Sequence, residues 1–165
     1  MATIRTVKPV TGIKGFDIVM SNLTREIKKI EGRTMKGLIE GSIIIRRDME
    51  VTSPTIPIDL GNLRASYFTV TAQSEQGGAP EFKGEKAAEL SSEHSTVVSE
   101  AKALAQTIKD PVVMMGFSAN YAMWVHENIG ASFQRPGSGA KFFESSMKRN
   151  TDAVLQVIAK NAQIR

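Results

Sequence analysis

The chain has 165 residues and a formal net charge of +4, and its 41% apolar and 23% charged residues are typical of one folded domain and not of a disordered chain. It contains no cysteine, which excludes a disulfide scaffold, a cysteine nucleophile and every thiolate metal site. No apolar run reaches about 18 residues, and residues 1–20 lack the continuous apolar core of a secretory signal, so we expect neither a transmembrane helix nor a signal peptide.

A long amphipathic helix is predicted over about residues 15–50. Apolar residues recur three and four positions apart at Phe16, Met20, Leu23, Ile27 and Ile30. Three glycines follow at positions 32, 37 and 41, and each costs about 1 kcal/mol relative to alanine inside a helix. They predict either a kink or a close approach of another element, and we favour the close approach.

Turn residues and a strand follow this helix. Pro54 and Pro57 end the helical region, and Asp59, Gly61 and Asn62 favour turns. Residues 67–71, Tyr-Phe-Thr-Val-Thr, are aromatic and β-branched and predict a strand. Residues 73–80 are typical of a polar loop.

A second amphipathic helix is predicted over residues 85–109, with a strand on either side. Its expected inner face is Leu90, His94, Val97, Ala101, Leu104 and Ile108. Asp110 and Pro111 end it, and the short apolar run at 112–117 predicts the second strand.

The C-terminal third predicts a short helix at 120–128, a glycine- and proline-containing loop at 129–139, and a final helix from about 140 to 162. The expected core face of the final helix is Phe143, Met147, Val154, Leu155 and Ile158.

Neither histidine is placed for a metal site. A helical zinc site needs two histidines four residues apart, and the residue four positions after His126 is Gly130. His94 lies on the apolar face of another predicted helix. We therefore expect no metal, and a partly buried, hydrogen-bonded role for each histidine.

No catalytic motif stands out. Residues 136–141, Pro-Gly-Ser-Gly-Ala-Lys, resemble a phosphate-binding loop in composition, but the spacing fails and Phe142 stands where a hydroxyl residue is required. A glycine turn leading into the last helix is the favoured interpretation. No serine lies in a Gly-x-Ser-x-Gly elbow. We expect no catalytic, cofactor or metal site, and no enzyme.

Two blocks of sequence, in this order, resemble the head–tail joining proteins of tailed bacteriophages. Residues 57–66 read Pro-Ile-Asp-Leu-Gly-Asn-Leu-Arg-Ala-Ser. Residues 116–127 contain Gly-Phe-Ser-Ala-Asn-Tyr-Ala and Val-His-Glu, and the block continues through 133–144 into the terminal helix. Such proteins, variously called minor capsid, neck, tail-completion or tail-terminator proteins, typically show Pro-x-x-x-Gly-x-Leu-Arg-x-Ser and then Tyr-Ala-x-x-Val-His/Glu-Glu. The resemblance covers roughly residues 15–72 and 111–160.

The resemblance implies an α+β fold, with which the predicted elements are compatible. We expect a single domain, 1–165, with a small antiparallel or mixed sheet, a long N-terminal helix, an amphipathic helix and a C-terminal helix. Residues 73–110 depart from the family pattern and are expected to form an inserted loop-helix element.

The resemblance also implies a structural protein of the virion neck or tail end, assembled in the host cytoplasm. It would form a homo-oligomeric ring of six, or alternatively twelve, subunits. Its partners would be neighbouring neck, portal-side or tail-tube proteins and the phage DNA in the channel, with no cofactor and no membrane.

In such a ring, apolar residues on surface loops are candidate subunit contacts, namely Trp124, Ile129 and Phe133. Arg64 and Arg135 are candidates to pair with a neighbour's carboxylate, and an intramolecular pairing is equally open. A DNA channel should hold phosphates weakly, and residues 51–110 carry a net charge of −3 between more basic ends. The candidate lumen- or partner-facing residues of this acidic segment are Glu75, Glu81, Glu85, Glu89, Glu93 and Glu100.

The alternative function is a small DNA-binding or DNA-packaging accessory protein that uses the basic first helix. A stable ring with little affinity for DNA favours the neck protein. A monomer or dimer whose DNA affinity falls steeply with salt favours the alternative.

Overall fold

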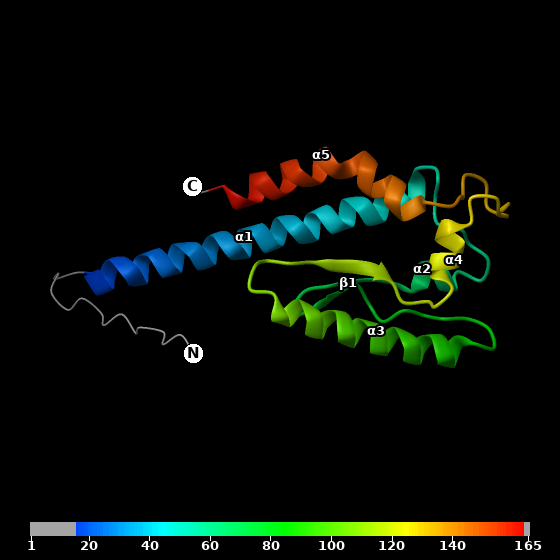
Figure 1. The fold of residues 1–165 in the computed structure, drawn as a ribbon, viewed down its shortest axis with the longest axis horizontal. Helices are drawn as coiled ribbons and strands as arrows, with labels where there is room; N and C mark the ends of the chain where they lie inside the picture. Colours follow the sequence, from blue (N-terminus) through cyan, green and yellow to red (C-terminus); the bar gives the residue numbers. More distant parts are fainter. Residues whose placement is uncertain (1–15, 164–165) are drawn as a thin grey trace, which may run out of the picture.

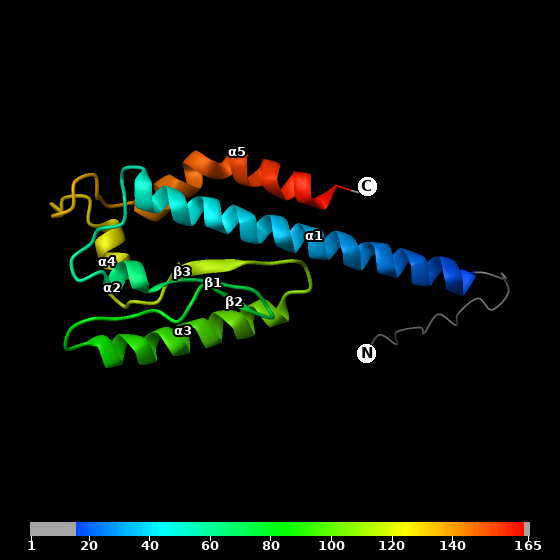
Figure 2. The same ribbon diagram turned by 180° about the vertical axis from the view of Figure 1, so that it is seen from behind.

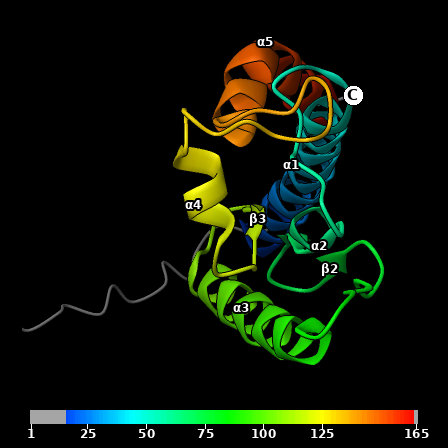
Figure 3. The same cartoon turned by 90° about the vertical axis from the view of Figure 1, so that its right-hand side faces the viewer.

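The computed structural model describes residues 16–163. The helix α1 (Phe16–Val51) runs the length of the molecule, and α5 (Phe142–Ala162) packs antiparallel against its C-terminal half (Figure 1). A small sheet lies on the other side of α1, and α3 (Ala87–Thr107) covers the far face of that sheet (Figure 3). The expectation about a signal peptide at residues 1–20 falls mostly outside the described residues. No helix between residues 16 and 163 is long and apolar enough to cross a membrane.

Two of the three glycines in α1 mark the closest contact with α5. A Cβ atom on Gly37 would lie 2.8 Å from the Cα of Ile158, and one on Gly41 would lie 2.8 Å from a methyl group of Val154. The side chain of glycine is a hydrogen atom, so the two helices approach more closely than any other residue would allow. The predicted close packing is confirmed at these two positions, whereas Gly32 has no neighbour within 4 Å of such an atom.

The sheet has three antiparallel strands in the order β2-β1-β3 (Figure 2). The central strand β1 (Tyr67–Val70) pairs with β3 (Met114–Phe117), with Tyr67 opposite Phe117. On its other edge it pairs with β2 (Glu75–Gln76), which lies in the stretch predicted as a loop. Two polar residues carry no strand pattern, so only the pairing with β1 reveals β2. The predicted α+β fold, with an antiparallel sheet, is confirmed.

The predicted inner face of α3 is partly wrong. Its buried residues are Leu90, His94, Val98 and Ala105. Leu104 is 57% exposed, and Ile108 lies beyond the last helical residue and is 40% exposed. The covered face is rotated toward Val98, which clusters with Phe68 and Val70 of β1, and toward the fully buried Ala105.

The predicted core face of α5 also needs correction. Met147 and Leu155 are 46% and 59% exposed, while Phe142 and Ser146 are buried. The Ser146 hydroxyl donates a hydrogen bond to the carbonyl oxygen of Ile45 in α1 (3.0 Å). Small and polar residues of α5 therefore form part of its contact with α1, and an apolar pattern does not detect them.

The main core lies at one end of the molecule, where α1, α3 and α5 meet the short helices α2 (Asn62–Ala65) and α4 (Ala122–Glu127). Its buried members are Ile45, Met49, Ile56, Leu63, Leu90, Ala119, Ala122 and Phe142. The N-terminal half of α1 projects away from this core (Figure 1). Every residue from 17 to 29 is exposed, although the helical pattern there is typical of a covered face.

Candidate subunit-interface site

A groove of about 410 Å³ opens beside α4, at the end of the molecule opposite the N-terminus of α1. One wall is the turn that precedes and includes the start of α2, residues 57–63, and the other is α4 with residues 132–134. We call it the α4 groove, and its lining consists mainly of Pro57, Ile58, Asp59, Leu60, Leu63, Tyr121, Val125 and Phe133. The groove therefore offers an apolar surface with one carboxylate, Asp59.

Large exposed apolar side chains lie in this groove, on α4 and just after α4. Leu60 lines it and is 57% exposed. Trp124 on α4 is 80% exposed, and Ile129, two residues after α4, is 79% exposed. Exposed apolar residues gathered at one place mark an interaction surface more often than single ones do. Three residues expected from the sequence as subunit contacts, Trp124, Ile129 and Phe133, thus lie in one region, and their contact with a neighbour stays a prediction.

Two carboxylates act on the Tyr121 hydroxyl, which lines the groove. Burial raises the pKa of the Tyr121 hydroxyl, and the nearby charges of Asp59 and Glu93 raise it further. The phenol is therefore neutral near pH 7 and can donate a hydrogen bond to an incoming acceptor.

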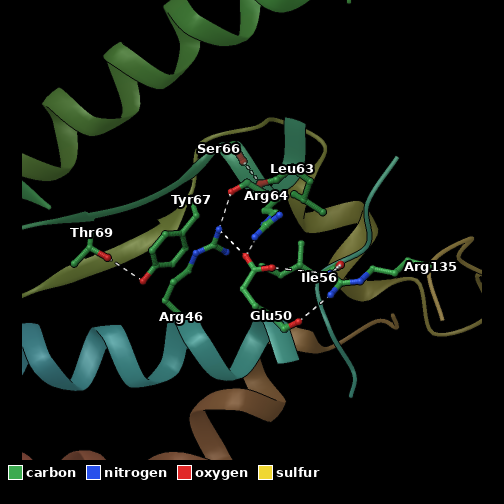
Figure 4. Close-up of polar contacts among 9 residues, drawn as sticks. All are labelled: Arg46, Glu50, Ile56, Leu63, Arg64, Ser66, Tyr67, Thr69 and Arg135. Carbon is green, nitrogen blue, oxygen red and sulfur yellow. Dashed lines mark hydrogen bonds and ion pairs between the residues drawn. The ribbon is translucent and has the colours of Figure 1, made fainter. Parts of the chain in front are cut away.

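Arg46, Arg64 and Arg135 gather around Glu50 (Figure 4). The Glu50 side chain is only 16% exposed, and its Oε1 lies 2.8 Å from Arg46 and 2.8 Å from Nε of Arg64. Burial lowers the pKa of Arg46, although the Glu50 carboxylate opposes that effect. The Arg46 guanidinium also lies 4.6 Å from the centre of the Tyr67 ring, a cation–π contact.

Arg135 connects the second wall to the same cluster. Its guanidinium donates hydrogen bonds to the backbone carbonyls of Glu50 (2.9 Å) and Ile56 (3.5 Å), and it lies 3.9 Å from the Glu50 carboxylate. Of the two pairings left open by the sequence, both Arg64 and Arg135 make the intramolecular one. Arg64 follows residues 57–63 and Arg135 follows 132–134, so these bonds fix both walls of the α4 groove to the end of α1.

His94 forms a buried contact that resembles a hydrolase triad only in composition. Its Nδ1 is 2.8 Å from the Ser118 hydroxyl, and its Nε2 is 3.5 Å from Glu75. Both His94 and Ser118 are buried, so water has little access to the pair. The contact links α3, β2 and the segment after β3, and the expected hydrogen-bonded role of His94 is confirmed.

His126 and the glycine loop form a second structural contact. The Nδ1 of His126 is 2.7 Å from the Glu127 carboxylate, and its ring packs edge-on against Phe142. Glu127 pairs with Lys141, which lowers the pKa of Glu127 and raises that of Lys141. The basic residue of the phosphate-loop-like segment is therefore paired with a carboxylate. Within residues 16–163 no three His, Cys, Asp or Glu side chains gather as a metal site would require.

The acidic residues of the predicted lumen- or partner-facing segment do not all point into solvent. Glu75, Glu81, Glu85, Glu89 and Glu100 are exposed, and Glu93 is half-buried. Glu75 lies beside His94, and Glu93 accepts a hydrogen bond from the backbone N–H of Asn120 (3.4 Å). Which of them face a channel in an assembly stays a prediction.

No family model, no curated protein and no solved structure matches the chain.

Sequence reasoning missed Arg46 and Glu50 as parts of this region. Their spacing of four residues on a predicted helix is the pattern of an ion pair and was the available signal. The exposed Leu60 lies within the first resemblance block but carries no sequence feature of its own that indicates exposure.

Proposed function

We propose that this chain is a structural subunit of a tailed-phage neck. It would form a ring that joins the head to the tail, or completes the tail, around the DNA channel. The sequence blocks at 57–66 and 116–144 support this proposal, and they coincide with the two walls of the α4 groove. A role in assembly thus accounts for the position of the residues that carry the resemblance.

The observation that carries the proposal is the presence of two apolar surfaces at opposite ends of the described molecule. At one end Val19 and Leu23 of α1 are 61% and 51% exposed. At the other end Trp124 and Ile129 are even more exposed. A subunit with two different contact surfaces joins copies of itself head to tail, and such a chain closes into a ring when the rotation allows it.

The proposal is tested by mass photometry and cryo-electron microscopy of the purified chain. We expect a closed ring, sixfold in the first instance, with an open central channel. In the virus that encodes the chain, deletion of the reading frame should yield separate heads and tails. A purified chain that stays monomeric, together with normal joined particles after deletion, would refute the proposal.

A specific observation favours the alternative, a DNA-binding accessory protein. Arg25, Lys28 and Lys29 lie together with Ser21 and Thr24 along one shallow surface of the projecting α1. If these residues hold DNA, the logarithm of the binding constant should fall with the logarithm of salt by about 0.9 per phosphate contact. Alanine at all three basic positions should reduce that slope. Under the neck proposal the same variant forms the normal ring.

A further inference from the structure

The N-terminal half of α1 carries an apolar stripe that α5 leaves uncovered. We define the apolar stripe as Val19, Met20, Leu23 and Ile27. At about 100° per residue, these residues fall on the same side of α1 as Gly37 and Gly41, which contact α5. The last residues of α5 lie beside Arg33 and Lys36, where a shallow groove also contains Asn161 and Gln163. The stripe is therefore a continuation of the α1–α5 interface without α5.

The uncovered part of α1 is long enough to be an interface. Residues 16–32 span roughly 25 Å at 1.5 Å per residue. The four stripe side chains are between 45% and 61% exposed, and nothing else within residues 16–163 covers them. An amphipathic helix gains stability by burying its apolar face, so this face requires an occupant.

A protomer cannot cover its own stripe with its own α4 groove. The helix α1 is continuous from Phe16 to Val51 and points away from α4 (Figures 1 and 2). The stripe and the groove thus lie at opposite ends of one rigid element. They can meet only when they belong to two different copies.

We infer that the apolar stripe of one copy docks in the α4 groove of the next copy. The inference rests on the proposed ring and names the contact that would close it. An amphipathic helix in an apolar groove is a common recognition mode, read through anchors about one turn apart, here Val19, Leu23 and Ile27.

The exposed apolar area suits such a contact. The contact would take in the stripe, the groove and the adjoining α4, whose large exposed side chains are Val19, Met20, Leu23, Ile27, Leu60 in the groove, Trp124 on α4 and Ile129 just after it. At about 100 Å² each, these side chains would bury on the order of 700 Å² of apolar surface. Because interfaces are about 60% apolar, the total buried interface area would be roughly 1,200 Å². That area is at the lower end of the range for specific, stable interfaces. In a closed ring, every subunit would make this contact with each of its two neighbours.

Two double variants each disrupt one of the two proposed contact surfaces. The stripe variant is Leu23→Glu with Ile27→Glu, and the groove variant is Leu60→Glu with Trp124→Glu. All four side chains are exposed, so the fold should survive, which circular dichroism would verify. Ile18→Glu and Leu155→Glu are matched controls, because Ile18 is 67% exposed on the opposite side of α1 and Leu155 is 59% exposed on α5.

Mass photometry and sedimentation velocity would follow assembly. We expect each double variant alone to be monomeric where the wild type and both controls assemble, with self-association at least tenfold weaker. An equimolar mixture of the two double variants should form a 1:1 dimer and nothing larger, because one intact stripe and one intact groove remain.

Each of the other outcomes either overturns the docking inference or distinguishes it from the proposal of a ring. A groove variant that assembles like the wild type would overturn it and indicate pairing of two α1 stripes. A wild-type monomer would overturn it as well. Rings formed by both double variants would overturn the docking mode while leaving the neck proposal intact. Open filaments from the wild type, with a dimer from the mixture, would support the docking and refute the ring.

Discussion

Alanine substitutions at two glycines of α1 should change stability in opposite directions. Gly32→Ala adds a methyl group that meets nothing within 4 Å, and the gain in helix propensity is about 1 kcal/mol. Gly37→Ala makes the same gain, but its Cβ would lie 2.8 Å from the Cα of Ile158 and 3.2 Å from the Cβ of Asn161. Overpacking of this kind costs roughly 1–3 kcal/mol, so we expect a net loss of about 1 kcal/mol.

Thermal unfolding followed by circular dichroism, at one fixed protein concentration, measures both changes. For a chain of this size 1 kcal/mol shifts the midpoint by about 2–4 °C. Gly32→Ala should therefore raise the midpoint by that amount, and Gly37→Ala should lower it by a similar amount. The contact with Gly37 is held by the nearby hydrogen bond from Asn161 to Glu40, which opposes a local withdrawal of α5. If Gly37→Ala stabilises as much as Gly32→Ala does, the close approach of α1 and α5 is wrong.

Three further predictions address the polar contacts and the projecting helix. Glu50→Ala removes the carboxylate shared by Arg46 and Arg64, and because those side chains are partly exposed we expect a loss of about 1–2 kcal/mol in denaturant unfolding. Burial raises the pKa of Asp48, but hydrogen bonds, the foremost from Arg149, outweigh it and hold the pKa below its ordinary value. This contribution is present above the unfolded pKa and is lost as pH falls through the folded one, so the deficit of Asp48→Asn at pH 7 should shrink as the pH is lowered and disappear below the folded pKa. In hydrogen exchange, amides 17–32 of the groove variant should exchange faster than amides 37–51, and should slow when the stripe variant is added.

The helix ends and strands could be read from the sequence because local chemistry decides them. Pro54 follows the end of α1 by three residues, and Pro111 follows α3 by four. The aromatic and β-branched residues 67–70 form β1 as expected. By contrast, β2 consists of a Glu-Gln pair that becomes a strand only beside β1, which no local pattern encodes.

The faces of the helices were harder to predict because neighbours decide which side is covered. In α5 the contact with α1 includes Ser146 and Asn161, whose amide donates a hydrogen bond to Glu40 (2.8 Å). Counting apolar residues selects Met147 and Leu155 instead, and both are exposed. In α1 the apolar period continues past the end of α5, so the pattern alone cannot distinguish a covered half from an uncovered one.

The candidate site could be predicted residue by residue but not as a groove. Ile129 stands next to Gly130 just after α4, and Trp124 lies within α4; each was expected at the surface from the sequence. The groove itself depends on residues 57–63 meeting residues 132–134. The bond from Arg135 to the carbonyl of Glu50 spans 85 positions of sequence and holds that arrangement. Contacts over such separations are set by the whole fold.

The dependence on salt concentration distinguishes the two proposed functions. Docking of the apolar stripe into the α4 groove removes apolar surface from water, and added salt does not screen that contribution. A grip on DNA by Arg25, Lys28 and Lys29 releases counterions and weakens steeply as salt rises. A ring around moving DNA needs the first behaviour, because its subunits must stay together while the DNA passes. An assembly of this chain that persists at high salt, with DNA affinity lost under the same conditions, is therefore what the neck proposal requires.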